Sequence, residues 1–413
     1  PNVRFVHASR DVPGPVTVDS FFKPMMEALT RPLTEKEKKG GRWVGPQQQR
    51  VLFEGTLDEA ETFYQQTKDI PYPVYAPIAT YADGFPIRVP TEERVKEMLT
   101  GTSHKPDEVI TYQSDRTVEG EEKKKGEVVR FRHSNWTATV EKVAINAIMA
   151  GCKPEHLPVV LAIAESGCPT HGPGGWMCVS GPIVKEIGMN THCGMLGPGS
   201  PVNTPIGRSY QLMAINLSDS VTGITRMEPL GYPFTNGGLC FGENADGLPP
   251  GWNGLNEEFG FRKDESVIMI GGGSGVVTGR FPPGGYRALQ QSGHGVIARR
   301  ICFKGTPGPH NWLEYLVPGL WAQREGAVTL LMLPEMAQHL YEYGFKSKDE
   351  IYEWLWKQSF VSLKDYKLRS QPDLSTNGWL GIEKTSGKHW KELPDDYMVP
   401  AGGNEPSGNC III

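Results

Sequence analysis

The sequence predicts an α/β protein in which helices pack on a layered mixed sheet, with a loop-rich Gly/Pro centre, an N-terminal extension and an extended C-terminal tail. Two observations carry this prediction. Apolar residues recur at helical spacing in some segments and form short continuous runs, typical of buried strands, in others. The 413 residues also include 49 glycines and 34 prolines, which concentrate between 166 and 310. Because long glycine-rich loops in a compact protein usually carry function, the chemistry is expected in this centre.

The clearest helix signal lies between Thr139 and Gly151, where apolar residues repeat every three to four positions and a glycine follows as a cap. A hydroxyl residue followed three positions later by glutamate predicts capped helix starts at Thr56 and Ser347. The apolar run 157–164 fits a strand or a helix, and a helix is expected. Further helices are expected at 91–101, 182–187, from Thr204 onward and at 334–343, and strands at 177–179, 266–270 and 328–333.

Three regions are expected along the chain. They are an N-terminal extension over 1–80, an α/β catalytic domain over 81–364 and an extended, polar C-terminal tail over 365–413. Within the catalytic domain, residues 101–138 are expected to form a polar connector with a charged turn. No internal repeat is visible.

The bulk composition favours an intracellular enzyme. The net charge of −5 indicates no nucleic-acid or anionic-membrane partner, and no run of about 18 apolar residues predicts a membrane span. Seven cysteines at irregular spacing favour reduced thiols, and the first residues show no secretory signal. A cytoplasmic location is therefore expected, and a homo-oligomer, most simply a homodimer, follows from general prevalence.

Cys168 is the first candidate for catalysis. It stands three residues before His171 in a Gly/Pro-rich turn, and a neighbouring base or cation lowers the pKa of a thiol and produces the nucleophilic thiolate. The alternative is a loop cysteine beside an exposed histidine. A second cysteine, for which Cys193, Cys240 and Cys410 are candidates, would resolve the adduct.

The same centre offers a possible metal set. Thiolates and imidazoles suit zinc, iron or copper. The alternative to a cofactor-free enzyme is a zinc or iron site that uses Cys168, His171, His192 and Cys193. Their spacing matches no zinc-finger pattern. Cys178 lies in an apolar segment, where a core position is expected.

A glycine loop that leads into a predicted helix is the candidate substrate site. The unpaired N–H groups of a first helical turn bind anions, and Arg208 on that turn offers a clamp for a carboxylate or phosphate. An ordinary capped helix with a surface arginine is the alternative. The expected binding residues here are Gly197, Gly199, Asn203, Thr204 and Arg208.

Three further segments complete the list of candidates. Glu243 and Asn244 follow Cys240 and are expected to orient substrate or to act in acid–base catalysis, the alternative being a turn. Cys410 is expected to belong to an inert tail, with a return to the active site as the alternative. The glycine run 271–275 follows a predicted strand but precedes no helix, so a flexible lid is favoured over a nucleotide site.

Several of these segments resemble the bacterial UGSC-motif (seleno)protein family. The resemblance covers roughly 83–360 and is carried by residues 139–147, 150–152, 157–160, 181–183, 197–199, 203, 206–208 and 243–244, with a weaker echo at 85–87 and 90–93. It implies thiol or selenol redox chemistry and supports the sites at 197–208 and 243–244. The motif that names the family is absent, so no cysteine of this chain inherits the reactive role.

Together these observations predict a cysteine-dependent enzyme that cleaves or reduces a carbon–heteroatom bond in a small anionic organic substrate. A metal-dependent hydratase, lyase or hydrolase that uses the Cys/His cluster is one alternative. A non-catalytic small-molecule binding protein is another.

Overall fold

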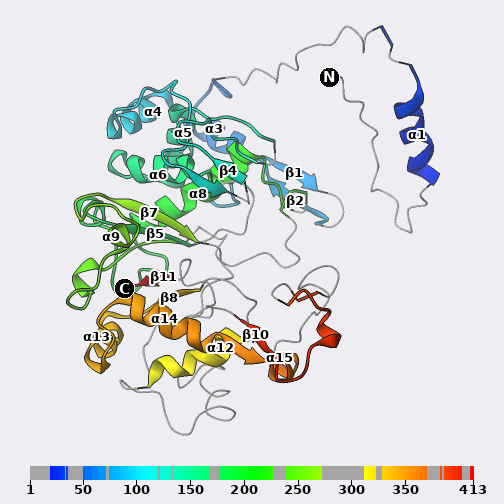
Figure 1. Cartoon of the computed structure of the whole chain (residues 1–413). Helices are drawn as coiled ribbons and strands as arrows, with labels where there is room; N and C mark the ends of the chain where they lie inside the picture. Colours follow the sequence, from blue (N-terminus) through cyan, green and yellow to red (C-terminus); the bar gives the residue numbers. More distant parts are fainter. Residues whose placement is uncertain are drawn as a thin grey trace. The chain divides into compact units, whose positions relative to one another are not determined.

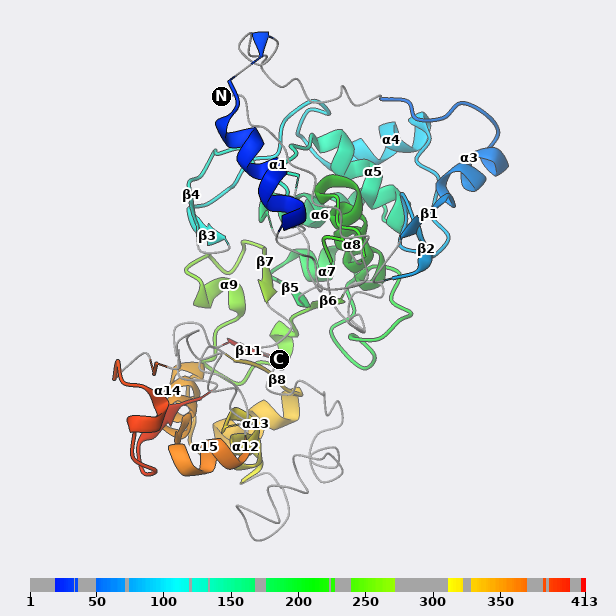
Figure 2. The same cartoon turned by 90° about the vertical axis from the view of Figure 1, so that its right-hand side faces the viewer.

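The structure of the protein is a computed structural model. This structure describes residues 19–32, 34–35, 50–70, 74–118, 121–132, 134–167, 176–222, 224–226, 239–271, 311–321, 328–369, 382–383, 386–401 and 410–413. The chain forms two compact units, Pro1–Thr80 and Tyr81–Ile413. The elements are labelled in Figures 1 and 2, and the second unit holds the sheet and helices considered below.

The described residues of the first unit include two helices and a hairpin. They are α1 (Asp19–Thr30), α3 (Leu57–Tyr64), β1 (Thr67–Ile70) and β2 (Ala76–Ala79), and β1 and β2 pair antiparallel. The predicted capping box is confirmed. The Thr56 hydroxyl accepts from the backbone N–H of Glu59, and the Glu59 carboxylate accepts from the backbone N–H of Thr56 at 2.8 Å.

A group of mutually packed helices opens the second unit. It contains α4 (Glu92–Met98), η1 (Leu99–Gly101), α5 (Val140–Ala150), η2 (Pro154–His156), α6 (Leu157–Glu165) and α8 (Asn203–Ser218), with α5, α6 and α8 in contact with one another. The predicted apolar face of α5 is buried, and Gly151 ends the helix at a φ of +91°. The run 157–164 is a helix, as expected.

The segment 101–138 differs from the polar connector that its composition predicts. It contains the hairpin of β3 (Arg116–Val118) and β4 (Glu121–Lys123). Val129 and Phe131 are fully buried. The charged run 121–125 lies in and directly after β4, while apolar side chains elsewhere in the segment enter the core. The average composition does not reveal these buried positions.

A mixed three-stranded sheet lies at the centre of the second unit. Its strands β5 (Trp176–Ser180), β6 (Leu239–Gly242) and β7 (Val267–Gly271) run in the order β6–β5–β7, with β6 parallel and β7 antiparallel to β5. Helix α7 (Ile183–Glu186) follows β5, while α8 contacts β6 and α6 contacts β7. The predicted α/β class is therefore confirmed.

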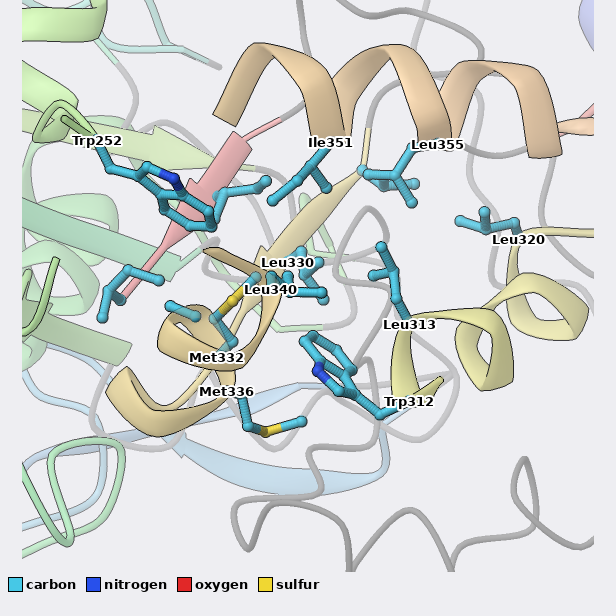
Figure 3. Packing of buried hydrophobic residues seen from close by; sticks show 14 residues of the cluster. Trp252, Trp312, Leu313, Leu320, Leu330, Met332, Met336, Leu340, Ile351 and Leu355 are labelled. Atoms are coloured by element: carbon cyan, nitrogen blue, oxygen red, sulfur yellow. The ribbon is translucent and has the colours of Figure 1, made fainter. Parts of the chain in front are cut away.

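A second hydrophobic core forms around the C-terminal helices. The elements are η6 (Trp312–Leu316), α12 (Val317–Trp321), β8 (Thr329–Leu331), α13 (Pro334–Tyr343) and α14 (Lys348–Gln358). Figure 3 shows Ile351 and Leu355 extending from α14 toward Leu330 of β8, with Trp312 on the opposite side of the cluster. This packing fixes the buried face of α14, and with it the direction of the first turn of that helix.

The C-terminal segment is packed against the rest of the second unit. After β9 (Phe360–Ser362) and α15 (Leu363–Arg369) come η7 (Trp390–Glu392), β10 (Met398–Pro400) and β11 (Cys410–Ile412). Strand β10 pairs antiparallel with β9, and β11 pairs parallel with β8. Residues 410–413 are all buried. Cys410 therefore lies in a buried strand and not in a free tail, because three consecutive isoleucines supply a strand that the core can bury.

Candidate functional site

The site begins where two parallel strands end side by side. Ser180 is the last residue of β5, and Glu243 directly follows β6. The strands pair in register, and the Glu243 N–H donates to the Val179 carbonyl at 2.8 Å. Side chains that follow the carboxyl ends of neighbouring parallel strands meet at one edge of a sheet, which is where α/β proteins commonly build their sites.

Glu243 holds a buried carboxylate. Its Oε2 accepts from the Ser180 hydroxyl at 2.6 Å and from the Leu255 N–H at 2.9 Å. Its Oε1 has no hydrogen bond and lies 3.5 Å from Nζ of Lys348, with none of the side chain exposed. A buried charge is costly unless it is paired, so the ammonium of Lys348 is the group that stabilises this oxygen.

Lys348 occupies an unusual place for a lysine. It is the first residue of α14, after the N-cap Ser347, and only 2% of its side chain is exposed. A positive charge opposes the dipole at a helix N-terminus, and lysine is rarely buried without partners. Nζ lies 2.9 Å from Oε2 of Glu258 and 3.5 Å from Glu243, so two carboxylates compensate both costs.

Glu258 is the more accessible of the two carboxylates. It ends the short helix α9 (Leu255–Glu258), and 17% of its side chain is exposed. The Tyr352 hydroxyl donates to Oε1 of Glu258 at 3.2 Å and accepts from the Ile411 N–H at 3.0 Å. Burial raises the pKa of Glu258, against the opposing effects of Lys348 and Tyr352, so its protonated form gains relative to an ordinary glutamate.

These groups border a pocket of about 300 Å³. We refer to Glu243, Lys348 and Glu258 as the ion triad; Lys348 and Glu258 lie in the wall of the pocket, and Glu243 lies behind Lys348. The size suits a small molecule. The residues that line the pocket are Gly251, Asn253, Leu255, Glu257, Glu258, Phe259, Ser347, Lys348, Asp349, Tyr352 and Cys410.

Cys410, which the sequence proposes as a second thiol, also lines this pocket. Strand β11 carries it there, and its Sγ lies 3.5 Å from Sδ of Met269. Burial raises its pKa to about 12, so the thiol is neutral near neutral pH. The structure thus brings Glu243 and Cys410 of the predicted set close to Lys348, Glu243 through its ion pair and Cys410 through the shared pocket wall.

The other predicted cysteines lie elsewhere or outside the described residues. Cys240 is buried in β6, where burial raises its pKa to about 12. Cys178 is buried in β5, as expected for a core position, and its pKa is raised by burial. Cys193 is exposed. Cys168 and His171, the predicted nucleophile and its partner, fall outside the described residues.

The glycine loop before α8 is organised differently from its prediction. The helix begins at Asn203, so Thr204 is its second residue and not its cap. The Ser200 hydroxyl accepts from the Asn203 N–H at 3.0 Å. The Asn203 amide donates to the Asn190 and Met195 carbonyls. Gly199 adopts a φ of +113° in this loop, and Gly197 precedes it. Asn203 therefore fastens the loop to the segment before it.

Arg208 is held by a carboxylate of the same unit. Its Nε and Nη2 donate to the two oxygens of Asp83, both at 2.8 Å, and Nη2 also donates to the Phe85 carbonyl at 3.3 Å. The Arg208 and Asp83 side chains are 15% and 10% exposed. The guanidinium N–H groups that would clamp a substrate carboxylate are therefore already bound to the carboxylate of Asp83.

Asn244 and the glycine run also have local roles. The Asn244 side chain accepts from the Gly247 N–H at 3.2 Å and begins η4 (Ala245–Gly247). Its N–H donates to the main-chain oxygen of Ile413 at 2.7 Å. The run after Gly271, expected to form a lid, lies outside the described residues.

No metal site is found among the residues that the structure describes, which include His192 and Cys193 but not Cys168 or His171. The His192 ring contacts the Thr191 hydroxyl at 2.9 Å. The described residues also include no single helix that is long and apolar enough to cross a membrane. One pair, Val140–Ala150 with Pro154–Glu165, meets the criteria of length and composition together, across a bend of 120°.

Comparison of the chain with protein-family models, curated proteins and solved structures finds no match. The resemblance to the UGSC-motif family therefore stays a prediction.

Sequence reasoning missed four residues of the site: Ser180, Glu258, Lys348 and Tyr352. The sequence holds one signal for them. Lys348 follows a helix cap, a position where acidic residues are favoured and a lysine is out of place. The segment Ser347–Glu350 also predicts a capping box, which by itself explains its residues, and Ser347 does accept from the Glu350 N–H at 3.3 Å.

Proposed function

We propose that the protein is an enzyme that performs general acid–base catalysis on a small polar molecule bound in the pocket beside α9 and α14. The observation that carries the proposal is the buried ion triad, in which one carboxylate, Glu258, is partly exposed to a pocket of about 300 Å³. Ionisable groups with perturbed pKa values in a concave site are the usual signature of catalysis.

Glu258 is the proposed acid–base group. Burial raises its pKa, which brings a carboxyl closer to the range where it both accepts and donates protons efficiently. When Glu258 is ionised, Lys348 stabilises the charge at 2.9 Å. The Tyr352 hydroxyl holds Oε1 at 3.2 Å and restricts the orientation of the carboxyl group.

Glu243 and Ser180 are proposed as positioning residues. Glu243 has no exposed side-chain surface, so it does not touch a ligand, and it pairs with the ammonium of Lys348 as a second carboxylate beside Glu258. Ser180 fixes Glu243 through a hydrogen bond of 2.6 Å. The sheet edge thereby sets the place of Lys348, and Lys348 sets the charge environment of Glu258.

A defined mixture of small polar metabolites, monitored by NMR, tests the proposal. We expect the wild-type protein to consume at least one compound and Glu258→Gln to lose that turnover at least 100-fold, the usual scale of general acid–base catalysis. Glu353→Gln is the matched control, because Glu353 lies on α14 with 66% of its side chain exposed. Equal turnover by Glu258→Gln would overturn the proposal, and binding without any turnover would favour a binding protein.

A cysteine-dependent reaction is the second candidate, and the position of Cys410 in the pocket wall supports it. The pKa of the Cys410 thiol is about 12, so a base has to remove its proton, and Glu258 lines the same pocket. The thiolate sulfur would then form a bond to the substrate carbon while the carbon–heteroatom bond breaks, and the leaving heteroatom would take the proton from Glu258. Loss of turnover in Cys410→Ser, at unchanged folding stability, would favour this reaction over acid–base chemistry alone.

A further inference from the structure

The charges around the pocket are unequal. Three carboxylates, Glu257, Glu258 and Asp349, line it with one lysine, and Glu243 lies behind that lysine. The positive charge of Lys348 is already shared between Glu243 and Glu258. A ligand that enters therefore meets an excess of negative charge, which persists even when Glu258 is protonated.

Glu257 and Asp349 provide the uncompensated part of this charge. In the described part of the chain, neither carboxylate has a hydrogen bond or an ion pair, in contrast to Glu258. Asp349 is exposed and Glu257 half-buried, so both are open to a partner from solution. A cation in the pocket would gain a direct ionic contact with either carboxylate.

Aromatic rings in the pocket wall add an independent preference for a cation. Phe259 lines the pocket although 52% of it is exposed, and Tyr352 lines it from α14. The face of an aromatic ring attracts a cation, and the apolar ring favours a ligand that carries hydrocarbon as well as charge.

We infer that this pocket binds a small organic cation, an ammonium group attached to an apolar body, and that such amines are the substrate class of the proposed enzyme. The statement about the substrate class depends on the proposed function, whereas the binding itself does not. The ammonium group would lie near Glu257 and Asp349, and the body near Phe259. An anion would find no such place, since the pocket's only described cation, Lys348, is held between two carboxylates.

Three compounds of one shape and different charge test this inference: benzylamine, benzyl alcohol and benzoate. Calorimetry at low salt is expected to show benzylamine binding at least tenfold more tightly than benzoate, with benzyl alcohol between them. The affinity for benzylamine should fall as salt is added, because partly exposed charges are screened. Benzoate binding as tightly as benzylamine, or no binding of benzylamine, would overturn the inference.

Variants locate the binding. The double variant Glu257→Gln/Asp349→Asn should weaken benzylamine at least tenfold, while Glu353→Gln on the exposed part of α14 leaves it unchanged. A thermal melt of each variant confirms that it is folded. Unchanged affinity in the folded double variant would place the cation elsewhere and refute the inference.

The two proposals fail in different ways. If benzoate is preferred while Glu258→Gln still abolishes metabolite turnover, the substrate class is wrong and the acid–base function stands. If benzylamine binds at Glu257 and Asp349 while Glu258→Gln keeps full turnover, the cation site stands and the catalytic role of Glu258 is wrong.

Discussion

Replacing Lys348 with methionine removes the charge at the centre of the ion triad and keeps most of the side-chain volume. Glu243 then has no cation beside a fully buried carboxylate, and Glu258 loses its partner at 2.9 Å. Burying an uncompensated charge is among the few changes that destabilise a protein severely. We therefore expect Lys348→Met to have one of the largest stability effects of any charge substitution in this chain.

The structure gives the magnitude. With an effective dielectric constant of about 20, the two ion pairs at 2.9 and 3.5 Å contribute attractions of about 6 and about 5 kcal/mol. Desolvation of the ammonium offsets several kcal/mol of this total. Removal of one partner from a buried pair costs about 3–5 kcal/mol in comparable cases, and we expect a loss in that range.

Urea denaturation followed by circular dichroism measures the loss. Lys357→Met is the matched control on the same helix, since Lys357 pairs with Glu353 at 2.8 Å with 58% of its side chain exposed. The control should change the free energy of unfolding by less than about 1 kcal/mol. If Lys348→Met loses no more than the control, the triad is not a buried ionic network and our reasoning about the site is wrong.

The remaining predictions concern protons, thiols and the backbone. Because burial raises the pKa of Glu258, the stability that its proton contributes is present below the ordinary glutamate value of 4.5 and is lost as pH rises through the raised pKa. Urea midpoints measured across this pH range should fall with rising pH in the wild type and fall less in Glu258→Gln. The same pH dependence in both proteins would show that the pKa of Glu258 is not raised. Iodoacetamide at pH 8 should alkylate exposed Cys193 well before Cys410, because a pKa of about 12 leaves the buried thiol about one thiolate in ten thousand molecules. Peptide mass spectrometry reads the order, and equal rates would contradict the buried position of Cys410. Gly181→Ala should lower stability by about 1–3 kcal/mol, since φ is +103° and the added carbon meets the Glu265 carbonyl oxygen. A variant with unchanged melting temperature would show that this turn relaxes freely.

Local sequence signals predict the elements whose stability is local. The apolar period and the following glycine predict α5, and Pro334 with Gly344 brackets α13 at the bounds that the structure shows. The sequence does not predict strands β6 and β11, because their stability is not local. Each is three or four residues long and gains its hydrogen bonds only from distant partners, β6 from β5 and β11 from β8. No pattern within so short a segment records that pairing.

In the site, too, the sequence indicates single residues by their chemistry but not the distant partners that they contact. Glu243 and Cys410 are chosen from the sequence for their chemistry, but their common neighbour Lys348 is not, because lysine is usually a surface residue and a capped helix explains its neighbours. Lys348 meets Glu258 across 90 residues of chain. Arg208 illustrates the reverse case. The sequence predicts a substrate anion for Arg208, whereas the structure pairs it with Asp83, 125 residues away, and sequence spacing cannot distinguish an internal partner from a substrate.

A ¹³C NMR titration of the glutamate carboxyl groups, with Glu258 assigned by its absence in Glu258→Gln, tests the central claim most directly. The claim is that the ion triad keeps one pocket-facing carboxyl ready to exchange protons. We predict that the Glu258 resonance titrates above the ordinary glutamate value of 4.5, because burial outweighs Lys348 and Tyr352. A Glu258 resonance that titrates at or below that value would show that the carboxyl is an ordinary ion-pair partner, and it would contradict the acid–base role.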